Sequence, residues 1–261
     1  ERYGRVLSFA GRNWGVKESK VDAGPGPNRF SLDTADVWVD DGEKLHLTIH
    51  QRGTQWFSTE IILKESLGYG RYLVQTSSRV DDLDSSAILG AYLWDAFGNP
   101  DLPIGRQNLE VDFEDGVWPT GPAGDTQFVV QPSETPGNLH RFTLPDLSDD
   151  TKLTRILTWQ EDHLEFVLAR GHYSLQDSIP QDAIVSQWTT TQDVPEPEQE
   201  RFRLNLWLRS GIPPANDGQL EVVIDRFEYV PEPASLSLLG AGLLVLIRRR
   251  PSRLVGYMKN P

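Results

Sequence analysis

Near its middle the chain reads Leu109-Glu110-Val111-Asp112-Phe113-Glu114, in which apolar and acidic residues alternate strictly. Successive side chains of a β-strand point to opposite faces of the sheet. As a strand, this stretch would bury its three apolar side chains in a core and place its three carboxyl groups together on the opposite face. The pattern therefore predicts a strand that is packed on one side only.

Alternating runs of the same kind recur along residues 1–229, and no long stretch there shows apolar residues at helical spacing. The runs lie at 45–49, 72–76, 128–131, 156–159, 164–168, 202–208 and 220–227. Their β-branched and aromatic residues, separated by turn sequences such as Asp41-Gly42, are typical of antiparallel strands. About a dozen strands in one unit predict a sandwich of two antiparallel sheets. The polar, proline-containing segment 176–200 is expected to form a long surface loop.

Composition excludes several classes of function. The 261 residues suit one large all-β domain, and 38% hydrophobic residues suffice for a core. A net charge of −13 argues against a nucleic-acid partner, because such a partner requires a basic face. The absence of Cys excludes a disulfide scaffold and thiolate chemistry.

The three carboxyl groups are unusual for a strand. A solvated sheet face is the ordinary interpretation of acidic residues at alternate positions, but three of them repel one another, and Asp115 follows without a compensating cation. Crowding raises the pKa of at least one of the three carboxyl groups. One group can then stay protonated and donate a proton while another of the same residue type is ionised and acts as a nucleophile. On a curved sheet, Glu110 and Glu114 could bring their carboxyl groups to about 5–5.5 Å, the spacing of a retaining glycosidase.

The run Glu110-Val111-Asp112-Phe113-Glu114 resembles the Glu-x-Asp-x-Glu signature of glycoside hydrolase family 16. Four other landmarks of that family have counterparts in the same order along the body. They are Leu67-Gly68-Tyr69-Gly70-Arg71-Tyr72, Leu89-Gly90-Ala91-Tyr92-Leu93-Trp94, the hairpin 157–166, and Asn205-Leu206-Trp207 with the terminal strand 222–229.

The resemblance implies a concanavalin A-like β-jelly roll with a carbohydrate cleft on its concave sheet. It also implies a retaining glycosidase that hydrolyses or transglycosylates a β-linked polysaccharide. In that family pattern Glu110 is the nucleophile, Asp112 the assisting acid and Glu114 the general acid/base.

Candidate substrate-binding residues follow from the resemblance, from strand parity and from the affinity of aromatic rings for sugars. They are Trp94, Asp95, Gln127, Gln131, His140, Asn205 and Trp207. The other four histidines are dispersed and show no metal-ligand spacing, so we expect no catalytic metal and no cofactor. A structural Ca2+ ion is left open.

The C-terminal residues differ in composition from the rest of the chain. Val230-Pro231-Glu232-Pro233 precedes fourteen uncharged residues, 234–247, which the cluster Arg248-Arg249-Arg250 closes. As a helix of about 21 Å this run would be short of the roughly 30 Å hydrocarbon core, and basic residues after an apolar run favour a cytoplasmic stop. The order resembles the PEP-CTERM sorting signal of Gram-negative bacteria.

The sorting resemblance implies export to the cell surface or the medium, transient membrane contact through 234–247, and an exosortase-type processing enzyme as partner. The expected organisation is a β-sandwich at 1–229 that folds without the tail, a sorting segment with a short apolar helix at 230–250, and a basic tail at 251–261. Two other functions stay open: a non-catalytic carbohydrate-binding sandwich of an exported surface matrix, and a purely structural surface protein.

Overall fold

The protein is described by a computed structural model covering residues 3–215 and 218–232, and this part of the chain contains sixteen β-strands and three short 3-10 helices. The first eight strands are β1 (Tyr3–Phe9), β2 (Arg12–Lys17), β3 (Val37–Val39), β4 (Leu45–Arg52), β5 (Gln55–Phe57), β6 (Thr59–Leu63), β7 (Gly70–Thr76) and β8 (Ala87–Trp94). The others are β9 (Val111–Asp115), β10 (Thr126–Val130), β11 (Leu139–Phe142), β12 (Leu153–Trp159), β13 (Leu164–Arg170), β14 (Ile184–Thr190), β15 (Arg201–Leu208) and β16 (Leu220–Pro231). The 3-10 helices are η1 (Val80–Asp82), η2 (Gln181–Ala183) and η3 (Arg209–Gly211).

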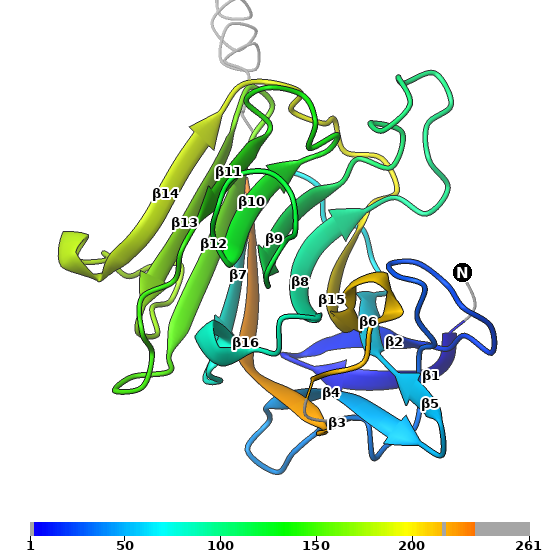
Figure 1. Ribbon diagram of the computed structural model, residues 1–261. Coiled ribbons are helices and arrows are strands. Elements are labelled where there is room, and N and C mark those ends of the chain that lie inside the picture. Colours follow the sequence, from blue (N-terminus) through cyan, green and yellow to red (C-terminus); the bar gives the residue numbers. More distant parts are fainter. Residues whose placement is uncertain (1–2, 216–217, 233–261) are drawn as a thin grey trace, which may run out of the picture.

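The strands form two stacked sheets (Figure 1). Sheet 1 has the order β1-β2-β6-β15-β8-β9-β10-β11, and sheet 2 has the order β14-β13-β12-β7-β16-β4-β3, with β5 paired to β4. Adjacent strands in both sheets run antiparallel. The predicted jelly-roll sandwich of two antiparallel sheets is confirmed, and β9, which carries the acidic stretch, lies inside sheet 1 between β8 and β10.

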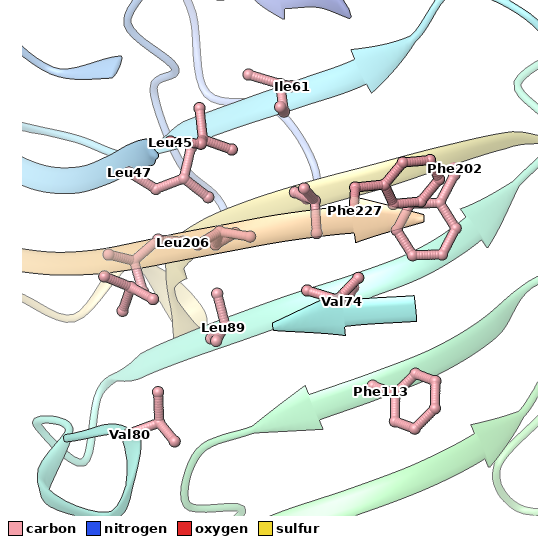
Figure 2. Packing of buried hydrophobic residues seen from close by; sticks show 14 of the residues in the cluster. Leu45, Leu47, Ile61, Val74, Val80, Leu89, Phe113, Phe202, Leu206 and Phe227 are labelled. Carbon is pink, nitrogen blue, oxygen red and sulfur yellow. The ribbon is translucent and has the colours of Figure 1, made fainter. Parts of the chain in front are cut away.

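The core fills the space between the sheets (Figure 2). Val111 and Phe113 of β9 are buried there, and Phe113 packs edge-on against Phe128 and Phe166 at ring-centroid distances of 5.2 Å. The period-two alternation of the sequence thus has its expected cause, because each inward side chain of sheet 1 meets side chains of sheet 2.

A buried ion pair joins the two sheets directly behind β9. The Asp115 carboxylate on the core face of β9 accepts a hydrogen bond from the Arg155 guanidinium on β12, and both side chains are 2% exposed. Thr76 of β7 also accepts from Arg155 at 3.1 Å, and the Thr126 hydroxyl donates to Asp115 at 3.1 Å. These hydrogen bonds offset the desolvation of two charges in an apolar interior.

The prediction of a long loop at 176–200 is wrong in part. Strand β14 lies within this segment and pairs with β13 at the edge of sheet 2. Its residues are mostly half-buried or exposed, so an edge strand shows no clean apolar alternation in the sequence.

The last strand reaches into the tail motif. β16 ends at Pro231, so the predicted domain boundary at residue 229 falls inside this strand. The expected apolar helix at 234–247 and the basic tail at 251–261 lie outside the described residues. Within residues 3–215 and 218–232, none of the helices has the length and apolarity needed to cross a bilayer.

Candidate active site

The acidic stretch begins with an unusual backbone conformation. Leu109 has a φ of 53°, in the left-handed region that few residues other than glycine adopt, while its side chain is buried. The next residue, Glu110, precedes β9 by one position, and its carbonyl accepts a hydrogen bond from the Gln131 N–H at 3.1 Å. The strained residue thus sets the direction in which the chain enters β9, and backbone strain of this kind is concentrated at functional sites.

Glu110, Asp112 and Glu114 all line one pocket of about 340 Å3 on the outer face of sheet 1. The floor comes from the neighbouring strands: in the strand register Tyr92 of β8 lies beside Asp112, and Gly90 of β8 lies beside Glu114. The expectation that the three carboxyl groups share one face therefore agrees with the structure.

Burial and mutual repulsion alter the acidity of the three groups. Desolvation, followed by the charge of Glu114, raises the pKa of Glu110 to about 8, although the positive charge of Arg203 opposes the rise. Desolvation raises the pKa of Glu114 to about 7, against the stabilising hydrogen bond from Gln127 and the charge of Arg141. Asp112 lies between them, and burial with two acidic neighbours raises its pKa well above its usual value. At neutral pH the cluster therefore retains protons.

Two glutamine side chains from the sequence prediction contact this cluster. The Gln127 amide on β10 donates to Glu114 Oε2 at 2.6 Å, and the Gln131 amide donates to Asp112 Oδ2 at 3.4 Å. Gln127 is buried, so its polar atoms depend on protein partners. Both residues hold carboxylates in place, whereas the sequence predicted direct contact with substrate.

A buried charge network forms the opposite side of the pocket. Glu60 of β6 is fully buried and is paired with Arg203 of β15 at 3.1 Å and with Lys17 of β2 at 2.8 Å. Lys17 and Arg203 both line the pocket. The pairing to Glu60 fixes the two cations, since a buried carboxylate is stable only with partners of this kind.

Asn205 of β15 lines the pocket beside Gly90. Its amide nitrogen donates to the Tyr92 hydroxyl at 3.3 Å, while its buried Oδ1 has no hydrogen-bond partner within the described part of the chain. A Cβ at position 90 would lie 2.4 Å from that oxygen, so a larger residue there would displace the Asn205 side chain. Asn205 Oδ1 is thus a buried acceptor at the floor of the pocket whose hydrogen-bonding capacity the described residues leave unused.

Trp94 of β8 and Trp207 of β15 line the same pocket, as the sequence predicted. Trp94 is half-buried, which leaves part of its ring surface accessible. Trp207 is 8% exposed, and its ring lies 6.2 Å from that of Trp118 between centroids. Trp94 is therefore the better stacking surface of the two.

The structure corrects two predicted binding residues. Asp95 is 1% exposed, and its carboxylate accepts backbone hydrogen bonds from Phe97 at 2.8 Å and from Gln199 at 3.4 Å, so it holds loops together. His140 points toward the space between the sheets, where it stacks on Trp188 with the centroids 5.9 Å apart. Neither residue lines the pocket.

Four residues at or beside the pocket were not predicted from the sequence: Arg203, Lys17, Tyr92 and Arg141. Strand parity could have found Arg203, because it lies two residues before Asn205, and Tyr92, because it lies two before Trp94. The choice of His140 in place of Arg141 was an error of one residue, which exchanges the faces of a strand. Lys17 gives no such signal, since only the pairing of β2 with β6 brings it to the pocket.

The described residues contain no cluster of three or more His, Cys, Asp or Glu side chains arranged to hold a metal ion. The pocket itself combines carboxylic acids, amides and aromatic rings. These groups can exchange protons, attack an electrophilic carbon and bind a polyhydroxylated ligand.

Several solved structures share this fold. The β-glucanase of Bacillus licheniformis superimposes with a TM-score of 0.58 at 13% identity, over 84% of this chain and 92% of that protein. The body has the β-glucanase fold. A prokaryotic β-1,3-1,4-glucanase (lichenase) from a mouse hindgut metagenome gives a TM-score of 0.57 at 16% identity, over 84% of this chain and 93% of that one.

A third similar structure is an immunostimulatory antigen and pseudo β-1,3-glucanase of Mycobacterium tuberculosis, with a TM-score of 0.58 at 17% identity over 84% and 91% of the two chains. No curated protein sequence matches this chain. Residues 230–250 match the family of the PEP-CTERM protein-sorting motif. That match confirms the sorting signal predicted from the sequence and indicates export.

The raised pKa values of Glu110 and Glu114 have a consequence for stability. The usual pKa of a Glu is 4.5, so the unfolded chain ionises at Glu110 and Glu114 before the folded chain does. We expect the free energy of unfolding to be highest below pH 4.5, as far as these groups are concerned, and to fall as the pH rises toward 8. The loss should exceed about 1.4 kcal/mol, the equivalent of one pKa unit.

Urea unfolding of the full chain between pH 5 and pH 8.5 measures this effect. Glu110→Gln, which cannot ionise, should unfold with a weaker pH dependence, and Glu134→Gln at an exposed loop position is the control. Equal slopes in the wild type and Glu110→Gln would show that Glu110 has the same pKa in both states.

Proposed function

We propose that this protein is a retaining glycoside hydrolase that cleaves a β-linked polysaccharide. The observation that supports the proposal most strongly is the set of three carboxyl groups, crowded and protonated in part, on the face of a β-glucanase fold. A binding module has no need of such a costly arrangement, because each of these groups destabilises the fold at neutral pH.

In the proposed reaction, Glu110 attacks the anomeric carbon while Glu114 donates its proton to the glycosidic oxygen. The bond between that carbon and oxygen breaks, and a glycosyl ester of Glu110 forms. Water then attacks the anomeric carbon, Glu114 accepts a proton from it, and Glu110 leaves as a carboxylate. Asp112 lies between the two and would retain a shared proton during both steps.

The positive charge of Arg203 supports an ionised Glu110, because it opposes the rise in the pKa of that carboxyl. Burial and mutual repulsion raise the pKa of both carboxyl groups, so their protonation does not by itself divide the roles. The division of roles therefore rests on the order of the motif. The half-buried Trp94 offers a stacking surface, and Asn205, which also lines the pocket, offers an amide group to a sugar hydroxyl.

The test is a screen of reducing-sugar release from laminarin, mixed-linkage glucan, xyloglucan, agarose and carrageenan. The wild type should cleave at least one of these, and Glu110→Gln should cleave none. The second candidate function is non-catalytic carbohydrate binding. The observation that favours it is the similarity to a pseudo β-1,3-glucanase. Binding of a polysaccharide without any cleavage would favour that candidate.

Trp94→Ala should weaken substrate binding more than it weakens the fold. The ring is half-buried and lines the pocket, so its removal takes away contact area for a sugar. We expect KM to rise about tenfold, corresponding to a stacking contribution of roughly 1.4 kcal/mol. Urea unfolding provides the comparison: a loss of about 3–5 kcal/mol with unchanged KM would identify Trp94 as a core residue.

The sorting motif supports export of this activity from the cytoplasm. We propose that an exosortase-type enzyme recognises the tail, that residues 234–247 contact the membrane transiently, and that the body is released to the surface or the medium. Fractionation of the native host with an antibody against the body tests this. Intact protein in the cytoplasm, with Arg248 to Arg250 still attached, would contradict it.

A further inference from the structure

Arg141 of β11 is connected to the candidate acid/base by two successive hydrogen bonds. Its Nε donates to Gln127 Oε1 at 2.8 Å, and the Gln127 amide nitrogen donates to Glu114 Oε2 at 2.6 Å. In the strand register Gln127 of β10 lies between Glu114 of β9 and Arg141 of β11, so the three side chains project from adjacent strands.

The guanidinium is held in place from its other side. Arg141 Nη1 donates to the carbonyl oxygens of Thr120 at 2.6 Å and Pro122 at 2.9 Å. A Cβ at Gly121, which has a φ of 88°, would lie 3.2 Å from that nitrogen, so the loop closes tightly on the guanidinium. The indole of Trp118 lies 6.0 Å from the guanidinium carbon.

Arginine chemistry determines the direction of the Gln127 amide. A guanidinium has only donors, so the Gln127 atom that faces it must be the oxygen, and the NH2 group must then face Glu114. An N–H donor favours the ionised form of a carboxyl group. Without Arg141 the buried amide could turn, and its oxygen would then accept the proton of a neutral Glu114.

We propose that Arg141 is a positioning residue that acts through Gln127 to limit the proton affinity of Glu114, and so sets the upper pH limit of the reaction. The proposal rests on the proposed function, since it concerns the group that donates the proton there. Arg141 does not line the pocket, and it acts on Glu114 in two ways: its charge favours the ionised carboxyl group, and its hydrogen bond orients the Gln127 amide.

Other charged groups face Glu114 and bear on its titration. On β9 these are Glu110 and Asp112, with Asp115 on the opposite face of the strand. Tyr92 of β8 and Arg203 of β15 line the same pocket. Lys17 of β2 lines this pocket as well. All of these groups remain in the variants below, so a change in titration reports the loss of Arg141 or of Gln127, and the double variant separates the two.

The test is the pH dependence of kcat/KM for wild type, Arg141→Met, Arg141→Lys, Gln127→Met and the double variant Arg141→Met/Gln127→Met. In Arg141→Met the basic limb should move up by about one pH unit, because Glu114 holds its proton longer. Gln127→Met should give a similar shift, and the double variant should add little to it. Arg141→Lys keeps a donor-only cation and should restore most of the wild-type profile.

Arg226→Met is the matched control, because Arg226 is exposed on the outer face of sheet 2 and pairs with Glu228. A purely structural role for Arg141 would lower kcat without moving the basic limb, and that result would overturn the proposal. Fully additive shifts in the double variant would overturn it too, since they would show that the guanidinium acts without Gln127.

A second readout separates this proposal from the proposed function. Carbon-13 NMR titration of the Glu114 carboxyl group needs no activity and should show a higher pKa in Gln127→Met than in the wild type. An inactive protein with that shift would refute the hydrolase and support the relay. An active protein with an unchanged Glu114 titration would refute the relay alone.

Discussion

Glu110→Gln should lower kcat by at least about 10^4-fold, because a carboxamide cannot form the glycosyl ester through which the proposed reaction passes. The fold should persist, since the substitution changes one atom and relieves repulsion with Glu114. Reducing-sugar release at saturating substrate measures the loss, and far-ultraviolet circular dichroism checks the fold. Full activity in this variant would refute catalysis at this site.

Two alanine variants assign the roles of the glutamates. With azide as an external nucleophile, Glu110→Ala should form a glycosyl azide of inverted configuration, because azide then occupies the place of the missing carboxylate. Glu114→Ala should form one of retained configuration, and it should keep activity on aryl glycosides whose leaving groups need no protonation. The opposite pattern would exchange the two roles.

Arg155→Met should destabilise the protein by about 3–5 kcal/mol, because it leaves the Asp115 carboxylate buried between the sheets without its cation. For a domain of this size the melting temperature should fall by about 10 °C. Urea unfolding at pH 7 gives the free-energy change. The exposed pair of Arg226 and Glu228 is the comparison. Arg226→Met should lower the free energy of unfolding by less than about 1 kcal/mol.

The double variant Asp115→Leu/Arg155→Met should recover most of that loss, because it removes both charges and fills the space with apolar groups. If Arg155→Met is as stable as the wild type, the pair does not hold the sheets together. Asp115 follows Glu114 directly on β9, so the double variant also tests whether the core can change behind the pocket while activity is kept.

The sandwich was predictable because the strands of its interior obey one physical rule. One face of β9, β12, β13 and β15 packs into the core between the sheets, and alternation of apolar side chains in the sequence records this. β14 escaped prediction because an edge strand has few buried side chains, so nothing in its composition distinguishes it from a loop. The order of strands within the sheets depends on pairing between distant segments, which alternation does not encode.

The candidate site was predictable where it follows one strand and unpredictable where it crosses strands. Parity placed Glu110, Asp112 and Glu114 together, and it placed Asn205 with Trp207. The link from Arg141 through Gln127 to Glu114 spans three strands and depends on their register. Asp95 was misjudged because a carboxylate beside a cleft residue looks the same in sequence whether it binds a ligand or caps backbone N–H groups.

The central claim is that Glu110 and Glu114 carry out a double displacement. Proton NMR of the first product formed from a susceptible polysaccharide or oligosaccharide, recorded before mutarotation, tests this most directly. The account predicts that the first anomeric signal is that of the β-anomer, so that configuration is retained. An initial α-anomer would mean direct attack by water, and it would contradict the assignment of Glu110 as nucleophile.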